Sequence, residues 1–295
     1  MVTARQWIAG ARPRTLPAAV VPVAVGTSAV VGEGDVIWWR AGAALVVALA
    51  LQVGVNYAND YSDGVRGTDS AARVGPLRLV GSGIAEPSAV KWAALTAFGV
   101  AAVSGGALAL AVGWELFLVG AAAIAAAWFY TGGRRPYGYL GLGEIFVFVF
   151  FGLVATVGST YVHLARITLT SVLLACSVGA LSVALLVVNN LRDRVGDEHS
   201  GKRTLAVRLG DLRTRRFYVG LVVGAAVPVV VVAFSRPLAL LALGAAAVAR
   251  RPIEIVRSGA VGGALIEALG GTARTLLVGG ALLTAGVALS GVFWS

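Results

Sequence analysis

Long stretches without a charged residue alternate with short polar segments along this chain. Eight charge-free windows hold 18 to 25 residues each: 15–32, 41–59, 92–114, 116–133, 145–165, 167–191, 217–235 and 275–295. A helix needs about 20 apolar residues to cross a bilayer core about 30 Å thick. A ninth window, 237–249, is shorter, but the arginines at its two ends can extend their side chains outward. The pattern predicts an all-α, polytopic membrane bundle with eight or nine spanning helices.

The positions of the basic residues predict how the helices are oriented. With nine spans and a cytoplasmic N-terminus, 21 of the 24 lysines and arginines fall in inner segments. Only Arg40, Arg166 and Arg236 then lie outside. If the ninth window did not span, the split would fall to 17 inside and seven outside. Because basic residues concentrate on the cytoplasmic side of membrane proteins, we expect nine transmembrane helices in the cell membrane.

The composition excludes several classes of protein. Charged residues make up 13% of the chain, about half the share usual in soluble domains. The net charge of +10 is spread over short loops, so it indicates topology and does not predict binding to nucleic acid. One cysteine and two histidines cannot form a disulfide framework or a multi-cysteine metal site. We therefore expect one transmembrane domain over residues 1–295.

Two of the expected helices end in acidic motifs. At the first, Asn56, Asp60 and Asp63 fall within an arc of about 60° at 100° per residue. Gly64 and Gly67 follow, and they allow the chain to fold Asp69 back toward the same side.

The second motif follows the sixth window and repeats part of this spacing. Asn189, Asp193 and Asp197 again fall on one helix face. Asn56 and Asn189, like Asp60 and Asp193, are 133 residues apart, which gives a faint internal repeat.

Clustered carboxylates at a membrane boundary need compensating charge. Hard cations with oxygen ligands supply it, and Mg²⁺ typically joins one or two carboxylates to substrate phosphates. The sequence therefore predicts a diphosphate and Mg²⁺ between the motifs, with metal ligands Asp60, Asp63, Asp193 and Asp197. Arg66, Lys202 and Arg203 lie nearby to neutralise phosphate oxygens. The alternative is that these acids are ordinary loop charges paired with neighbouring arginines.

Four stretches of the chain resemble the UbiA superfamily of intramembrane aromatic prenyltransferases. They are 12–17 (RPRTLP), 59–69 (NDYSDGVRGTD), 141–144 (GLGE) and 201–210 (GKRTLAVRLG), supported by the asparagine and aspartates at 189–197. The aspartate spacing in 59–69 is most similar to the branch that prenylates 1,4-dihydroxy-2-naphthoate in menaquinone synthesis.

The resemblance implies nine helices around a cavity open to the cytoplasm and to lipid. It implies Mg²⁺ on the acidic motifs and transfer of a polyprenyl group from its diphosphate to the naphthoate, with loss of CO₂, to give demethylmenaquinone. The four aspartates and Lys202 would be catalytic. The ring faces of Phe129, Tyr130 and Tyr57 would stabilise the allylic carbocation.

Further side chains complete the expected substrate site. Arg14 would meet the acceptor carboxylate or the diphosphate, although it also serves as a topology arginine. Glu144 would lie near the aromatic acceptor, although an acid in a first helical turn also favours the helix dipole. The expected substrate-binding set is Asn56, Asn59, Arg66, Asp69, Asn189, Arg203, Tyr130, Arg14 and Glu144.

Other functions remain open from the sequence. A transporter or ion channel is the alternative of a different class, because intramembrane acids also mark ion paths. A conduction path would need more polar residues along the helices than Gln52 and Ser182 provide. Within the resembling superfamily, 4-hydroxybenzoate, chlorophyll-type or haem-type acceptors are the other possibilities.

Overall fold

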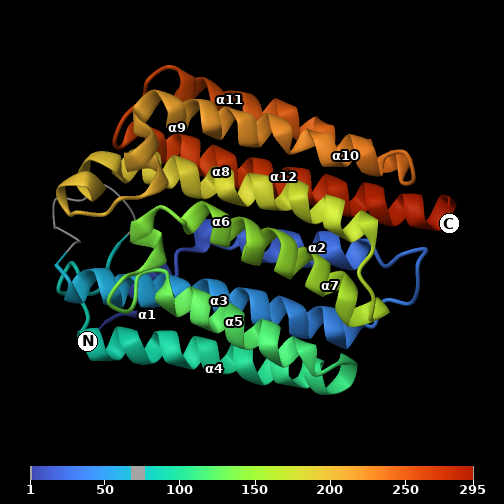
Figure 1. Ribbon diagram of the computed structural model, residues 1–295, viewed down its shortest axis with the longest axis horizontal. Coiled ribbons are helices and arrows are strands. Elements are labelled where there is room, and N and C mark those ends of the chain that lie inside the picture. The colour runs from blue at the N-terminus through green and yellow to red at the C-terminus, as the bar shows by residue number, and fades with distance from the viewer. Residues whose placement is uncertain (1, 68–76, 295) are drawn as a thin grey trace.

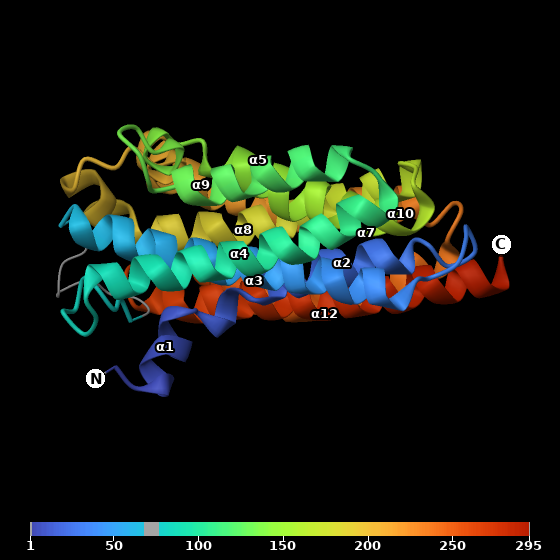
Figure 2. The same cartoon turned by 90° about the horizontal axis from the view of Figure 1, so that it is seen from below.

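The computed structural model describes residues 2–67 and 77–294, and every regular element in them is helical. The long helices run side by side in alternating directions along one axis (Figures 1 and 2). In chain order the elements are α1 (Ala4–Gly10), η1 (Pro13–Thr15), α2 (Pro17–Ser28), α3 (Trp38–Val65), α4 (Pro87–Val112), α5 (Glu115–Phe129), η2 (Tyr137–Leu140), α6 (Gly143–Val147), η3 (Phe148–Val154), α7 (Ala155–Leu164), α8 (Leu169–His199), α9 (Leu205–Gly224), α10 (Ala226–Val232), η4 (Pro237–Ala245), α11 (Ala246–Arg257) and α12 (Ala264–Phe293).

Six helical stretches in the described part are long and apolar enough to cross a membrane. They are Trp38–Val65, Pro87–Val112, Gly143–Leu164, Leu169–His199, Leu205–Val232 and Gly262–Phe293. The first and fourth windows correspond to the shorter apolar helices α2 and α5. The ninth window, 237–249, falls on the 3₁₀ turns of η4 and the first residues of α11. The predicted all-α membrane bundle is confirmed, with six helices of full spanning length.

The helix ends follow local rules that the sequence makes visible. The Thr3 and Thr168 side chains each accept a hydrogen bond from the backbone three residues later, in reciprocal capping boxes. Pro17 and Pro87 occupy first helical positions, where a missing N–H costs nothing. These signals mark where α1, α2, α4 and α8 begin.

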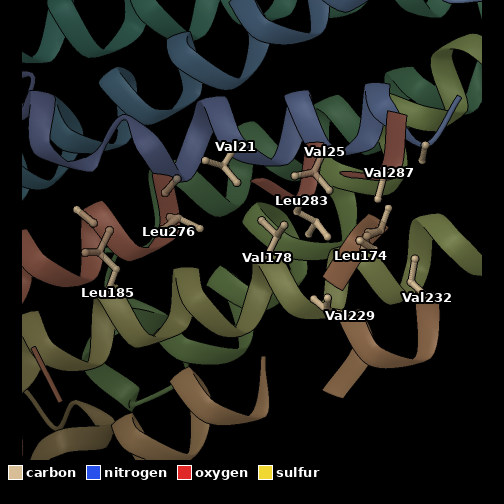
Figure 3. Packing of buried hydrophobic residues seen from close by; sticks show 14 residues of the cluster. Val21, Val25, Leu174, Val178, Leu185, Val229, Val232, Leu276, Leu283 and Val287 are labelled. Atoms are coloured by element: carbon tan, nitrogen blue, oxygen red, sulfur yellow. The ribbon is translucent and has the colours of Figure 1, made fainter. Parts of the chain in front are cut away.

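A valine- and leucine-rich core joins α2, α8, α10 and α12. In Figure 3, Val21 and Val25 of α2 lie against α12, and Val178 lies between them and α10. A glycine also brings backbones close where α2 crosses α7: a Cβ on Gly26 would collide with the Thr156 carbonyl. Close approach at small residues is the usual way in which membrane helices pack.

The helix from Gly143 to Leu164 contains a π-helical segment, η3, in its middle. Gly152 in this segment packs against Gly179 of α8, and neither position has room for a side chain. A π-helical turn contains more residues than an α-helical turn, and such segments are frequent at functional sites.

The two acidic motifs lie at the same end of the bundle. Helices α3 and α8 run in the same direction, and both end on the left of Figure 1, where α9 begins. We call this the polar end of the molecule.

Candidate functional site

A large cavity reaches from the polar end into the bundle. Its volume is about 880 Å³, and residues from α2 to α8, with the loops that join them, form most of its wall. Three of the predicted acids line it, Asp63 of α3 and Asp193 and Asp197 of α8. The two motifs, 133 residues apart in sequence, therefore face one space.

Asp63 is paired with basic and hydroxyl groups from three other parts of the chain. It is 2% exposed, and its Oδ2 lies 3.1 Å from Lys202 Nζ and 3.4 Å from Arg78 Nη2. The Tyr139 hydroxyl donates to Oδ1 at 2.5 Å. Burying a carboxylate is costly unless it is paired and hydrogen-bonded. The basic residues here compensate the acid and at the same time place positive charge on the cavity wall.

Asp60 occupies a different environment, although it is only one turn away. It is fully buried, and it accepts hydrogen bonds from the Leu79 amide at 2.7 Å and the Val80 amide at 3.1 Å. It is not among the residues that line the cavity. In this structure Asp60 fastens the segment after residue 77 to α3, a role that its spacing did not indicate.

Asp193 is held by its neighbour in sequence. Arg192 donates through Nε and Nη2 to the two carboxylate oxygens of Asp193, both at 2.7 Å, and through Nη2 to Asn189 Oδ1 at 2.9 Å. A two-pronged arginine contact fixes the orientation of a carboxylate as well as its charge. All three residues line the cavity, so α8 presents an ordered cluster of polar groups there.

The asparagines of the first motif line the cavity and tie its wall together. Asn56 donates through Nδ2 to the Ala11 carbonyl at 2.9 Å and to Thr15 Oγ1 at 3.1 Å. Asn59 accepts from Thr131 Oγ1 at 2.8 Å. The N-terminal segment and the end of α5 are thereby fixed to α3.

The predicted basic residues fall into two groups. Lys202 is buried and lines the cavity, and Arg14 lines it from an exposed position. Arg66 and Arg203 are exposed and do not line it. Arg66 instead donates to the Thr131 and Gly133 carbonyls. Asp69 lies outside the described residues.

Of the three predicted aromatic residues, Tyr130 lines the cavity. Phe129 is 52% exposed at the end of α5, and the Tyr57 hydroxyl donates to the Trp7 carbonyl at 2.8 Å. These two rings do not line the cavity in this structure. Glu144 is buried behind the wall, where its Oε1 accepts from Asn190 Nδ2 at 3.0 Å, and Asn190 lines the cavity.

Comparison with known proteins now identifies the fold. The family model of UbiA prenyltransferases matches residues 19–258. The chain belongs to the UbiA prenyltransferase family. It is 50% identical, over 94% of its own length and 95% of the relative's, to 1,4-dihydroxy-2-naphthoate octaprenyltransferase of Mycobacterium tuberculosis. It is 38% identical to the protein of the same name from Escherichia coli, over 75% and 74% of the two chains.

Solved structures agree with the UbiA fold. A UbiA homologue from Archaeoglobus fulgidus bound to DMAPP and Mg²⁺ superposes with a TM-score of 0.57 at 14% identity, covering 94% of this chain and 99% of that one. The apo structure of a UbiA homologue from Aeropyrum pernix K1 gives 0.66 at 14% identity, with coverage of 92% and 97%. At this identity the likeness concerns the fold alone.

The donor atoms of this UbiA-family cavity suit Mg²⁺. Asp63, Asp193 and Asp197 offer carboxylate oxygens, and Asn189 offers an amide oxygen, which are the ligands that this ion prefers. Among residues 2–67 and 77–294, no three His, Cys, Asp or Glu side chains are gathered closely enough to hold a metal by themselves. Such a set fits an ion that shares its coordination with substrate phosphates.

Three site residues had not been predicted from the sequence. Arg78, Tyr139 and Arg192 all line the cavity and contact its acids. Arg192 could have been found, because it directly precedes Asp193 on a helix that presents a polar face. Arg78 lies in a loop and Tyr139 in the short 3₁₀ turn η2, where no periodicity indicates which side chains meet.

Proposed function

We propose that this chain transfers a polyprenyl group from a polyprenyl diphosphate to 1,4-dihydroxy-2-naphthoate, releasing diphosphate and CO₂ and forming demethylmenaquinol, the reduced form of demethylmenaquinone. The observation that carries the proposal is a single cavity with two kinds of wall. Its polar end gathers acids and bases suited to a metal-bound diphosphate, and the rest is apolar enough for a prenyl chain and an aromatic ring. The names of the two bacterial relatives support the same substrates.

The polar end would bind the donor. Asp63, Asp193 and Asp197 would hold Mg²⁺, which when bound stabilises the negative charge of the leaving diphosphate as a Lewis acid. Lys202 and Arg78, which flank Asp63, would contact the phosphate oxygens. This arrangement places positive charge beside the diphosphate, where negative charge develops during the reaction, and not along the prenyl chain.

The bond changes require no redox partner. The allylic C–O bond breaks, and its electron pair leaves with the diphosphate. A ring carbon of the naphthoate supplies the electron pair of the new C–C bond. The bond from that carbon to the carboxylate then breaks, CO₂ departs, and the electron pair restores the aromatic ring. The apolar residues of the cavity exclude water, which would otherwise capture the carbocation.

We further propose nine membrane spans in a single domain, with the N-terminus and the polar end on the cytoplasmic side. The shorter helices α2 and α5 and the continuous η4–α11 rod lie alongside the six longer spans, which supports this count (Figure 1). The position of basic residues supports the orientation. Labelling of Arg203→Cys and Arg166→Cys variants, with Cys176 replaced by alanine, tests it: an impermeant thiol reagent added outside intact cells should modify only the second.

The enzymatic proposal is tested with purified protein in lipid nanodiscs. Octaprenyl diphosphate, Mg²⁺ and 1,4-dihydroxy-2-naphthoate should give a product whose mass equals acceptor plus prenyl group minus CO₂, or its two-electron oxidised form. A parallel reaction with 4-hydroxybenzoate should give little product. Turnover with the benzoate alone would overturn the choice of acceptor, and absence of any prenylated product would overturn the proposed activity.

A further inference from the structure

Four aromatic side chains form a continuous row on the cavity wall, which we call the aromatic ladder: Tyr130, Tyr137, Phe146 and Phe150. The rings of Tyr130 and Tyr137 meet edge to face with centroids 5.5 Å apart. Those of Tyr137 and Phe146 stack at 3.9 Å, and those of Phe146 and Phe150 are near parallel at 6.1 Å. All four line the cavity, and they come from the end of α5, the η2 turn, α6 and η3.

The ladder is held in place by its surroundings. The Tyr137 hydroxyl donates to the Ala126 carbonyl at 2.7 Å, and burial raises the pKa of this phenol, so it stays protonated. Gly138 and Gly143 leave room for the Tyr130 ring, because a Cβ on either would crowd its edge. These rings are therefore fixed before any ligand enters.

The π-helical segment explains why so many side chains of one helix reach the cavity. Phe146, Phe150, Phe151 and Val154 all line it. The wide turn of η3, which starts at Phe148, spreads more residues over one face than an α-helix would. Gly152 lies against Gly179 on the side that packs on α8, and this contact keeps the segment close to its neighbour.

One end of the ladder adjoins the reacting centre. Tyr130 lines the same cavity as Asp63 and Asp197, and a Cβ on Gly143, the residue before Glu144, would lie 3.5 Å from its hydroxyl. The Glu144–Asn190 hydrogen bond adds polar groups at the same place. A ligand that lies along the ladder would thus have hydrogen-bonding groups beside one end and only rings beside the other.

We propose that the aromatic ladder is the surface on which the two fused rings of the aromatic acceptor pack. The ring that carries the carboxylate and hydroxyls lies at Tyr130 and Tyr137, and the second ring reaches Phe146 and Phe150. Aromatic pairs gain energy beyond the area they bury, provided that their geometry is fixed. This inference rests on the proposed function, since it assigns the naphthoate its place within that site.

The prenyl chain is the other apolar group that needs a place, and a different wall suits it better. Elsewhere the cavity is bounded by small side chains, among them Ala101, Gly105, Gly120 and Ala123. A flexible chain adapts to such a smooth surface, whereas a rigid planar ligand gains most from rigid rings. The polar groups beside Tyr130 can also form hydrogen bonds with the hydroxyls of an acceptor, whereas a prenyl chain has no hydroxyls to bind there.

The test is a binding measurement that requires neither metal nor donor. Dissociation constants of 1-hydroxy-2-naphthoate and of its single-ring counterpart, 2-hydroxybenzoate, are measured by calorimetry in nanodiscs. For Phe146→Leu we expect naphthoate binding to weaken by about two- to tenfold and benzoate binding by less than about twofold. Phe146→Tyr keeps the ring and should bind both ligands as the wild type does. Phe117→Leu, at a cavity phenylalanine of α5 outside the ladder, is the matched control.

The outcomes separate this inference from the proposed function. If Phe146→Leu weakened the binding of both ligands equally, or left the binding of both unchanged, the ladder assignment would be overturned. The proposed function would still stand, because wild-type turnover tests it independently. Loss of selectivity for prenyl chain length in Phe146→Leu, with unchanged naphthoate binding, would assign the ladder to the donor instead. Failure of the wild type to prenylate the naphthoate would overturn the proposed function itself.

Discussion

The two acidic motifs share a spacing but do not share a structural role. Asn56 and Asp60 of α3 match Asn189 and Asp193 of α8 in sequence. Asp193 lines the cavity and accepts hydrogen bonds from Arg192, whereas Asp60 is buried and accepts hydrogen bonds from the backbone amides of residues 79 and 80. The equivalent place on the cavity wall is taken by Asp63, three residues later.

The difference shows what a spacing determines and what it leaves open. Residues at equal offsets lie at equal heights on their helices, but packing decides which side of each helix faces the cavity. On α3 the loop that follows residue 77 covers Asp60, and on α8 Asp193 lies in the open wall. The pair that faces the same space is therefore Asp63 with Asp193.

The largest expected effect follows from that pairing. Asp63→Asn and Asp193→Asn each remove a cavity carboxylate without changing its size, and we expect turnover to fall by at least about 100-fold in each. Because both would act on the same metal-bound diphosphate, the double variant should be little worse than the worse single variant. Turnover of the three variants in nanodiscs measures this. Multiplicative losses would mean that the two acids act separately.

The dependence of turnover on Mg²⁺ concentration should distinguish Asp193, which lines the cavity, from Asp60, which does not. We expect the Mg²⁺ concentration for half-maximal turnover to rise about tenfold in Asp193→Asn, because one oxygen ligand loses its charge. In Asp60→Asn it should stay within about twofold of the wild-type value. Titration of chelator-treated protein with Mg²⁺ gives both numbers. A shift as large in Asp60→Asn would show that Asp60 reaches the ion when substrate is bound.

Asp60→Asn should instead weaken the fold near the polar end. The change removes the charge of a buried carboxylate that accepts hydrogen bonds from two backbone N–H groups. A hydrogen bond to a charged group contributes about 1.5–3 kcal/mol to the free energy of unfolding. We expect a lower thermal unfolding midpoint and faster proteolysis between residues 77 and 85. Glu198→Gln, at an exposed acid near the end of α8, is the control and should unfold near the wild-type temperature.

The sequence predicts the parts of this molecule that depend on regular repeats. Charge-free windows identify the long helices, and the 3.6-residue period places each acidic motif on one helix face. The rotation of α3, which buries Asp60, depends on contacts with residues 79 and 80 that no local pattern encodes. The η2 turn and the π-helical segment, which set the position of Tyr137 and Phe150, likewise arise from packing against distant helices.

The basic residues that follow the two motifs extend the comparison. Lys202 is buried beside Asp63 and lines the cavity. We expect Lys202→Ala to raise the KM for the prenyl diphosphate about tenfold and to leave the KM for the naphthoate nearly unchanged, because the lost charge faces phosphate. Steady-state kinetics with each substrate varied in turn provides the measurement. An effect confined to the aromatic substrate would contradict this assignment.

Arg66, the basic residue that follows the first motif, should matter least. Its guanidinium donates to the Thr131 and Gly133 carbonyls and lies over the Tyr139 ring, and Arg66 itself does not line the cavity, so its charge is already engaged by the protein. We expect Arg66→Gln to change the KM for the prenyl diphosphate by less than about twofold, since the glutamine amide can still donate to a carbonyl and exposed charges contribute little. Measured beside Lys202→Ala under the same conditions, it completes the contrast between the motifs. If Arg66→Gln raised the KM for the prenyl diphosphate as much as Lys202→Ala does, both motifs would bring a cation to the diphosphate. The C-terminal ends of α3 and α8 would then be equivalent in function despite their different packing.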